Sequence, residues 1–331
     1  MENKIKEIVL KSFNENEIES VKVFKGRAIV TLKNVGGNKE KEDTIRKEIE
    51  KIKDIEKVSI VYTGDKQAPK LDPNDGTWKI SQVKKIIAVA SGKGGVGKST
   101  TSVNLALALA NQNKKVALFD ADIYGPSIST MLGYADTPPA TFDGKRFEPF
   151  YHMSIKSMSI GSLLDKSQPL VWRGAKVCQA IEQLITETNW GEIDIMVIDM
   201  PPGTGDTQIT LSQRLKLDGA VIVSTPQDIA LIDAVKGVNM FKMVNVSILG
   251  VIENMSYYIC EKCGERAEIF GHKGAKETAD KIGVDFLGEI PLHIKIRENA
   301  DNGTPIVFAE PESPHTKAYE EIAKKIIDKM G

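Results

Sequence analysis

The sequence predicts an α/β protein whose main part is a mostly parallel, doubly wound sheet, preceded by a small α+β domain. The first observation is an apolar run at 86–90 that leads through a glycine-dense turn into a segment with helical spacing. The second is that strand-like and helix-like segments go on alternating from Lys84 onward, as in proteins built from βαβ units. The third is the length of 331 residues, which suits about two domains.

Three stretches divide the chain. Residues 1–63 are predicted to form the small domain, in the order helix, strand, strand, helix, strand. Its elements are a helix at 4–13, two short strands within 21–35, a charged amphipathic helix at 39–53 and a strand at 58–62. Residues 64–83 have the composition of a linker, with prolines and glycines among polar residues. Residues 84–331 carry the main sheet.

Within the main domain, the elements follow from apolar spacing and turn residues. Between Tyr134 and Leu164 the pattern is less regular, and there Pro138-Pro139 and an Asp143-Gly144 turn flank a predicted hairpin. Strands are predicted at 86–90, 115–119, 193–198, 221–224, 248–252 and 286–290, and helices at 174–188 and 316–330.

Charge and hydropathy exclude several classes of partner. The chain has 44 basic and 45 acidic residues, so no strongly basic surface is expected to attract nucleic acid or an anionic membrane. The N-terminus lacks the apolar core of a signal peptide, and no stretch approaches the roughly 20 apolar residues of a membrane span. We therefore expect a cytoplasmic protein with no nucleic-acid or membrane partner.

A phosphate-binding loop is the strongest functional motif. Residues 92–99 fit the template G-x-x-x-x-G-K-[ST] between a strand and a helix. Glycines let backbone N–H groups turn inward around phosphate oxygens, the lysine adds a positive charge, and the serine hydroxyl can ligate Mg²⁺. The alternative is a glycine-rich turn that only packs. The residues predicted to bind nucleotide are Gly92, Lys93, Gly94, Gly95, Val96, Gly97, Lys98, Ser99 and Thr100.

Two predicted strands end in carboxylates at the edge of the sheet where active sites gather. Asp199 is predicted to hold Mg²⁺ with Ser99, directly or through water, and its alternative role is to cap the next helix. Asp120 and Asp122 follow the strand at 115–119. Asp122 is predicted to orient the attacking water and Asp120 to support the structure or the Mg²⁺ site, but the sequence does not rank these two.

Cys260 and Cys263 form a Cys-x-x-Cys pair that suits a metal. Two thiolates can hold one ion or one edge of a cluster, whereas zinc and [4Fe-4S] sites take four ligands. A two-fold dimer would supply the other two. Cys178 shares a helical face with two isoleucines and is interpreted as a core cysteine, and His272 as a surface residue. A redox dithiol is the alternative.

The early lysine, Lys93, makes the phosphate loop more specific. GKGGVGKST resembles the deviant Walker A motif of the MinD/ParA/nitrogenase-reductase class of ATPases. The resemblance implies that Lys93 reaches across a nucleotide-sandwich dimer and neutralises charge on the partner's phosphates in the transition state. It also implies that Asn254 contacts the adenine base and that Pro291 lies in the matching later loop. A solvated loop lysine is the alternative for Lys93.

Four motifs together resemble the Mrp/ApbC family of iron–sulfur cluster carrier ATPases: GKGGVGKST, DADIYGPS, IDMPPGTGD and NMSYYIC-x-x-C-x-x-x-x-x-IFG. The resemblance covers residues 84–331 and implies a P-loop NTPase fold with ATP and Mg²⁺. It implies slow hydrolysis by Lys93, Lys98 and Asp122, and a [4Fe-4S] cluster bridged by the cysteine pairs of a homodimer. The implied partners are apo iron–sulfur proteins and a cluster-assembly scaffold.

The small domain resembles, more weakly, the MIP18-like domain that often precedes such an ATPase. Residues 1–63 lack the Asp-Pro-Glu stretch and the cysteine of that domain. Cluster handling, partner docking and a purely structural role therefore all stay open for it.

Other functions fit parts of the sequence. A MinD/ParA-like dimerisation switch would need a basic or membrane-seeking surface, and acidic residues interrupt the lysines of the C-terminal helix. An electron-transfer reductase of the nitrogenase type has a cluster cysteine near the second carboxylate loop, and residues 199–213 contain none. A zinc-stapled dimer differs from the cluster carrier in its metal, which a set of thiolates does not reveal.

Overall fold

The computed structural model describes residues 2–24, 27–33, 39–52, 55, 57–63, 76–135, 137–141, 146–162 and 174–331. These residues belong to two compact units, one within residues 1–70 and one within 71–331. In the described part of the chain, no helix is both long and apolar enough to cross a membrane.

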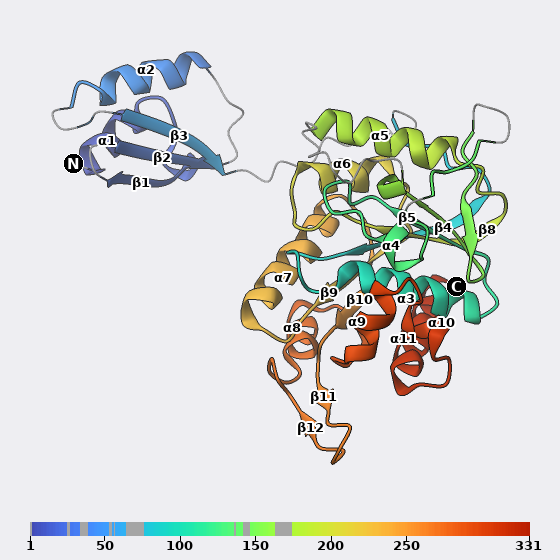
Figure 1. Ribbon diagram of the computed structural model, residues 1–331. Helices are drawn as coiled ribbons and strands as arrows, with labels where there is room; N and C mark the ends of the chain where they lie inside the picture. Colours follow the sequence, from blue (N-terminus) through green and yellow to red (C-terminus); the bar gives the residue numbers. More distant parts are fainter. Residues whose placement is uncertain are drawn as a thin grey trace. The chain divides into compact units, whose positions relative to one another are not determined.

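The N-terminal unit is a three-stranded sheet covered by helices (Figure 1). Its elements are α1 Glu2–Leu10, the short helix η1 Glu15–Glu17, β1 Ile18–Phe24, β2 Arg27–Lys33, α2 Lys39–Ile49 and β3 Lys57–Thr63. β1 pairs antiparallel with β2, and β2 pairs parallel with β3. Ile5 of α1, Ile45 of α2 and Leu32 of β2 meet in one core. Both helices thus bury one apolar face, and the order of elements is the predicted one.

The second unit is built on an eight-stranded sheet. Its strands are β4 Val83–Ala90, β5 Val116–Asp120, β6 Phe150–His152, β7 Ile155–Ser159, β8 Ile193–Asp199, β9 Gly219–Ser224, β10 Ile248–Glu253 and β13 Phe286–Glu289. Their spatial order is β13-β10-β9-β4-β8-β5-β7-β6. Neighbouring strands pair in parallel except for the β6–β7 hairpin. The predicted mostly parallel sheet is confirmed.

Helices cover both faces of this sheet (Figure 1). They are α3 Lys98–Asn111, α4 Ile128–Met131, α5 Gly174–Glu187, α6 Asp206–Arg214, α7 Asp228–Met243, α8 Gly274–Ile282, α9 Ile294–Asp301, α10 Ile306–Ala309 and α11 Pro314–Met330, with a short helix η2 Ile160–Ser162. Successive β4 side chains alternate between two cores: Ile86 and Ala88 pack with α5 to α8, and Ile87 and Val89 with α3, α10 and α11. This alternation makes the sheet doubly wound, as predicted.

β4 is the strand at which the chain changes direction across the sheet. The chain runs from β4 to β5 and β7 on one side, returns to β8, and then crosses to β9, β10 and β13 on the other side. Ligands bind at the carboxyl ends of strands beside such a reversal. The phosphate loop follows β4, while β5 and β8 end in Asp120 and Asp199, which are register partners. The fold therefore brings the predicted site residues to one edge.

Two segments add to the predicted picture. The irregular region contains the β6–β7 hairpin, whose turn is Met153–Ser154 with φ of +50° and +65°, while the predicted Asp143-Gly144 turn lies outside the described residues. Trp78, from the predicted linker, is buried in the core, and its backbone N–H donates to the Arg214 carbonyl at 2.8 Å. Residues 76–83 therefore pack as part of the second unit.

Candidate nucleotide site and cysteine hairpin

The loop between β4 and α3 has the backbone conformation that a phosphate loop requires. Gly95 and Gly97 have φ of +83° and +80°, values that L side chains rarely adopt. A Cβ on Gly97, the N-cap of α3, would lie 2.2 Å from Asn254 Nδ2, so this glycine is also needed for space. The start of α3 thus presents backbone N–H groups and a partial positive charge to an anion.

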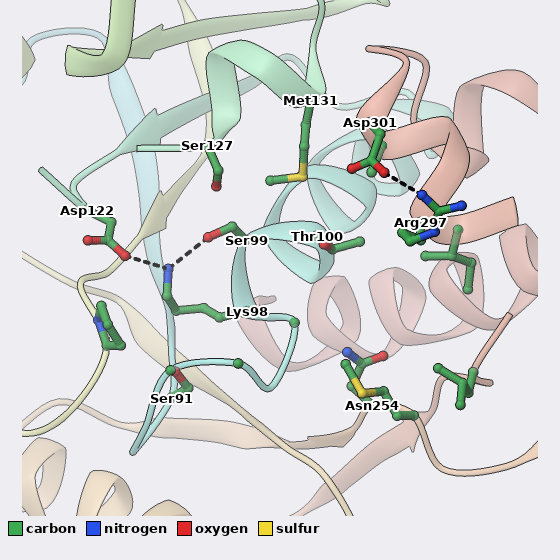
Figure 2. A pocket seen from close by; sticks show the side chains of 18 of the residues that line it. Ser91, Lys98, Ser99, Thr100, Asp122, Ser127, Met131, Asn254, Arg297 and Asp301 are labelled. Atoms are coloured by element: carbon green, nitrogen blue, oxygen red, sulfur yellow. Dashed lines mark hydrogen bonds and ion pairs between the residues drawn. The ribbon is translucent and has the colours of Figure 1, made fainter. Parts of the chain in front are cut away.

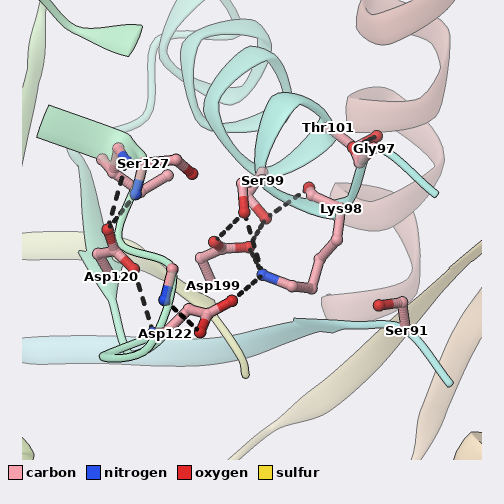
Figure 3. Close-up of polar contacts among 12 residues, drawn as sticks. Ser91, Gly97, Lys98, Ser99, Thr101, Asp120, Asp122, Ser127 and Asp199 are labelled. Atoms are coloured by element: carbon pink, nitrogen blue, oxygen red, sulfur yellow. Dashed lines mark hydrogen bonds and ion pairs between the residues drawn. The ribbon is translucent and has the colours of Figure 1, made fainter. Parts of the chain in front are cut away.

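Lys98 lies among carboxylates at the end of the sheet (Figure 3). Its Nζ is 2.8 Å from Asp199 Oδ1 and 3.8 Å from Asp122 Oδ2, and its side chain is 6% exposed. The Ser99 hydroxyl lies 3.1 Å from the same Nζ. A phosphate that recruits the charge of this lysine must therefore compete with Asp199.

Asp199 is fully buried and is hydrogen-bonded by two serines of α3. Ser99 Oγ donates to Oδ2 and Ser102 Oγ donates to Oδ1, each at 2.6 Å. A hydroxyl and a carboxylate side by side are oxygen donors of the kind that Mg²⁺ takes together with phosphate oxygens. The donor set therefore fits the predicted ion. Ser102 was not predicted, although its spacing from Ser99 places it on the same face of the helix.

Asp120 and Asp122 have different surroundings. These surroundings distinguish the two roles, structural support and orientation of water, that the sequence does not assign firmly. Asp120 accepts hydrogen bonds from Ser159 Oγ at 2.8 Å and from the backbone N–H groups of Ser127 and Ile128 at 3.2 Å. Burial, and then the charge of Asp199, raises the pKa of Asp120 to about 7. Asp120 therefore braces the loop that follows β5.

Asp122 faces the open side of the site. It lines the cavity beside the phosphate loop (Figure 2). Burial raises the pKa of its carboxyl and the charge of Lys98 opposes that shift. Of the two aspartates, Asp122 is the one placed to meet a water molecule at a nucleotide.

The cavity has a volume of about 560 Å³, within the roughly 300–1,000 Å³ usual for small-molecule sites. One end is lined by the phosphate loop and Asp122, and Lys93 lies at this end. Within the described residues, the Lys93 amine has no carboxylate partner, while its carbonyl accepts from Ser91 Oγ at 2.8 Å. The cavity is also lined by residues that follow β10 and β13, namely Asn254, Met255, Pro291, Leu292, His293, Ile296 and Arg297.

The Asn254 side chain is anchored to the phosphate loop and leaves its amide oxygen as an acceptor for a ligand. Its Nδ2 donates to the Val96 carbonyl of the phosphate loop at 2.8 Å. The amide Oδ1 therefore remains as an acceptor, which suits the exocyclic amine of adenine and not the carbonyl of guanine. Pro291 also lines the cavity, and its place in a later loop beside the base stays a prediction.

The cysteine pair lies in the turn of a small antiparallel hairpin, β11 Tyr258–Ile259 and β12 Arg266–Ala267. The Cys260 N–H donates to the Glu265 carbonyl at 2.9 Å, and the Gly264 N–H donates to the Cys260 carbonyl at 2.8 Å. The backbone N–H groups of Cys263 and Lys262 lower the pKa of the Cys260 thiol. Cys263 is exposed and Cys260 half-buried, so both sulfurs are accessible.

One protomer offers too few ligands for a cluster by itself. The described residues contain no group of three or more histidine, cysteine and acidic side chains that could hold a metal ion. Cys178 on α5 is half-buried, so the prediction of a core cysteine is only partly met. His272 is a surface residue, as predicted, and its Nδ1 lies 3.4 Å from Glu268 Oε1. The two hairpin cysteines are half of the four ligands that a [4Fe-4S] cluster takes.

Buried and stacked groups hold the hairpin segment at its two ends, Ser256 and Ala275, which we call its feet. None of these groups was predicted. Glu253 is fully buried and accepts from Ser256 Oγ at 2.5 Å and from the Ala275 N–H at 2.7 Å. The Arg266 guanidinium lies 3.9 Å from the centre of the Tyr257 ring. Ala275 belongs to α8, which only the fold brings to Glu253, so no local pattern indicates this contact.

Comparisons with known proteins assign the second unit to a family. Residues 82–327 match the family described as ParA, NUBPL iron-transfer P-loop NTPase. The iron–sulfur cluster transfer protein NUBPL of Dictyostelium discoideum is 50% identical over 252 residues, 76% of this chain and 78% of that protein. The iron–sulfur cluster carrier protein of Salmonella typhimurium is 52% identical over 247 residues, 75% of this chain and 67% of that protein.

Solved structures show the same fold. A nucleotide-binding protein of Archaeoglobus fulgidus in complex with ADP aligns with a TM-score of 0.63 and 38% identity, over 72% of this chain and 92% of that one. The cell division ATPase MinD of Pyrococcus furiosus aligns with a TM-score of 0.58 and 26% identity, over 75% of this chain and 99% of that one.

Proposed function

As the chain belongs to the NUBPL iron-transfer P-loop NTPase family, we propose that it binds ATP with Mg²⁺ and carries a [4Fe-4S] cluster for delivery to apo-proteins. The observation that carries this proposal is the position of the cysteine hairpin. Asn254 and Met255 line the nucleotide cavity, and the same segment continues directly into the turn with Cys260 and Cys263. Nucleotide and cargo thus occupy neighbouring parts of one chain segment.

The nucleotide chemistry assigned to the cavity uses the groups gathered at the sheet edge. Lys98 exchanges Asp199 for the β- and γ-phosphates, and Ser99 and Asp199 hold Mg²⁺, which neutralises the phosphates. Asp122 orients the attacking water. Lys93 of a second protomer adds positive charge where negative charge develops in the transition state, so hydrolysis requires a dimer.

The cargo site is formed by two protomers. Cys260 and Cys263 are accessible, and a lowered pKa favours the thiolate form of Cys260 that binds iron. Two thiolates per chain give four in a two-fold dimer, the number that a [4Fe-4S] cluster takes. Relatives named as cluster carrier and cluster transfer proteins support iron–sulfur cargo over zinc. The partners are then a scaffold that supplies the cluster and apo iron–sulfur proteins that receive it.

The remaining assignments concern organisation and location. We propose that residues 84–331, with the packed segment 76–83 before them, are the ATPase domain and that residues 1–63 are a separate module. The rest of the predicted linker, 64–75, lies outside the described residues. We also propose a cytoplasmic location.

The proposal is tested by anaerobic reconstitution of the full chain with iron and sulfide. Iron, sulfide, visible absorption and dimer mass are measured for the wild type and for the double variant Cys260→Ala/Cys263→Ala. We expect about four iron and four sulfide per dimer, lost in the double variant and kept in the matched control Cys178→Ser. Transfer of the cluster to an apo-protein acceptor is then followed with ATP and without nucleotide.

A different outcome would change the assignment. If the purified dimer binds only zinc, or hydrolyses ATP with no metal at the cysteines, the chain is a nucleotide-driven dimerisation switch with structural or redox cysteines. Iron retained in the double variant would show that other residues hold the cluster.

A further inference from the structure

One histidine contacts both the nucleotide cavity and the cysteine turn. His293 follows β13, lines the cavity and caps the N-terminus of α9. Its Nε2 lies 3.1 Å from Oε1 of Glu261, which stands between Cys260 and Cys263 in the chain. A single side-chain contact therefore links the wall of the nucleotide cavity to the turn that carries the two cysteines.

The hydrogen bonds around His293 fix the orientation of its ring. Nδ1 accepts the backbone N–H of Lys295 at 3.3 Å, so in the neutral ring the proton is on Nε2 and is donated to Glu261. The His315 ring packs against the His293 ring with centroids 4.1 Å apart. The His293 side chain is 10% exposed and that of Glu261 is 63% exposed. The histidine is thus the fixed partner, and the glutamate is the partner that is free to leave.

Backbone hydrogen bonds join the same two segments. The Ser256 N–H donates to the Ile290 carbonyl at 3.0 Å, and the Leu292 N–H donates to the Tyr257 carbonyl at 2.7 Å. Each segment has residues at the cavity wall, Met255 in one and Leu292 in the other. A displacement of the wall at 291–293 is therefore passed to the base of the hairpin at 256–257.

We propose that the His293–Glu261 contact transmits occupancy of the nucleotide cavity to the cysteine turn. The inference rests on the proposed function only in that the cavity takes a nucleotide. The turn has two arrangements, one with the His293–Glu261 contact made and one with it broken. A nucleotide that contacts the wall at 291–293 binds these two arrangements with different affinities, so it shifts their populations. The accessibility of Cys260 and Cys263 changes with them, and by linkage a ligand on the cysteines changes nucleotide affinity by the same factor. His293 is in this sense a positioning residue for the turn.

The test measures thiol reactivity, which needs no cluster. The metal-free, reduced full chain is treated with iodoacetamide, and alkylation rates at Cys260 and Cys263 are read from peptide masses, with and without saturating Mg–ADP. In the wild type we expect the rates to change about fivefold or more on addition of nucleotide, the lower end of ordinary coupling between sites. In Glu261→Ala we expect this dependence to disappear, while calorimetry in parallel shows that ADP still binds, with an affinity that differs from the wild-type value by no more than the coupling factor.

Two further variants separate coupling from a general disturbance of the loop. Glu261→Gln keeps an oxygen that can accept from His293, so it should restore the nucleotide dependence. Glu265→Ala removes another exposed glutamate of the same turn and should behave as the wild type. Glu261 is exposed, so its replacement leaves the fold intact.

The outcomes are distinct from those that test the cargo. Alkylation rates that ignore nucleotide in the wild type, or that respond equally in wild type and Glu261→Ala, would overturn the inference. Thiols that respond to nucleotide in a chain that never holds a cluster would support the inference and refute the cluster carrier. A chain that binds a cluster but whose thiol reactivity does not change with nucleotide would support the cluster carrier and refute the inference.

Discussion

Lys98 Nζ lies 2.8 Å from Asp199 Oδ1, so the cation that the phosphates need is already paired inside the protein. Asp122 and Asp120 add two more carboxylates around it, and burial, together with the charge of Asp199, raises the pKa of Asp120. Mg²⁺ and nucleotide together can relieve this crowding, because the metal adds positive charge while the lysine turns to the phosphates.

Lys98→Ala should abolish nucleotide binding and weaken the fold. The change removes the phosphate ligand and leaves Asp199 buried without its cation, at a cost of about 3 kcal/mol, the lower end for such losses because two serines still donate to it. Calorimetric titration with Mg–ADP and urea unfolding measure the two effects. Lys84→Ala, which breaks only an exposed pair with Asp194, is the matched control and should change stability by less than about 1 kcal/mol. Wild-type affinity in Lys98→Ala would contradict the phosphate-loop assignment.

Lys93→Ala should keep ADP binding and lose ATP hydrolysis, because its amine acts on the partner's nucleotide. A mixing experiment tests this directly. Lys93→Ala and Asp122→Asn are each expected to be inactive, yet in a mixed dimer the second variant supplies Lys93 to the first. Equal mixing should restore about a quarter of wild-type activity, since half of the dimers are mixed and each has one complete site. No recovery in dimers shown to have exchanged would mean that Lys93 acts within its own protomer.

Asn254 should set the choice of base. Its Oδ1 is the free acceptor, so ADP is expected to bind about tenfold more tightly than GDP, the value of one good hydrogen bond plus the penalty of opposed acceptors. In Asn254→Ala this preference should shrink towards unity. Competition of ADP and GDP for a fluorescent nucleotide measures the ratio in both proteins. An unchanged ratio in the variant would place base recognition elsewhere in the cavity.

Asp120 should make stability depend on pH. Its pKa is about 7 in the folded chain, against 3.8 as its ordinary value, so the folded state holds the proton more tightly than the unfolded state. Its contribution to the free energy of unfolding therefore falls as pH rises from about 4 to about 7. Urea unfolding of the metal-free protein between about pH 5 and pH 7.5 measures this slope. The slope should be smaller in Asp120→Asn, and an equal slope in both proteins would refute the assignment.

The fold and the family were accessible from the sequence because their signals are local. A strand, a glycine-rich turn and a helix stand in one stretch, 86–110, and the β-branched strands that follow it are buried on both faces and read as apolar runs. The predicted resemblance to iron–sulfur carrier ATPases is confirmed by the relatives that the chain matches. Several helices, such as α7, were not delimited, because a helix packed on more than one side has a weak apolar stripe.

What the sequence could not supply are partners distant along the chain. Asp120 and Asp122 look alike in DADIYGPS, and they are told apart by their surroundings in the fold, such as the hydroxyl of Ser159 beside Asp120 and the cavity beside Asp122. His293 reads as one of four histidines, and its contact with Glu261 depends on the pairing of β13 beside β10. Such contacts follow from sheet order, which no single segment encodes.

The hairpin that carries the cysteines is an excursion between β10 and α8, and both of its feet stand on the carboxylate of Glu253. Because that buried group holds Ser256 and Ala275, both ends of the excursion are fixed at the sheet independently of most of the 18 residues, 257–274, that lie between them. Length and composition there can vary at little cost to the ATPase core. The architecture therefore places the cysteine turn where evolution or an engineer can exchange it for another turn while the P-loop core stays constant.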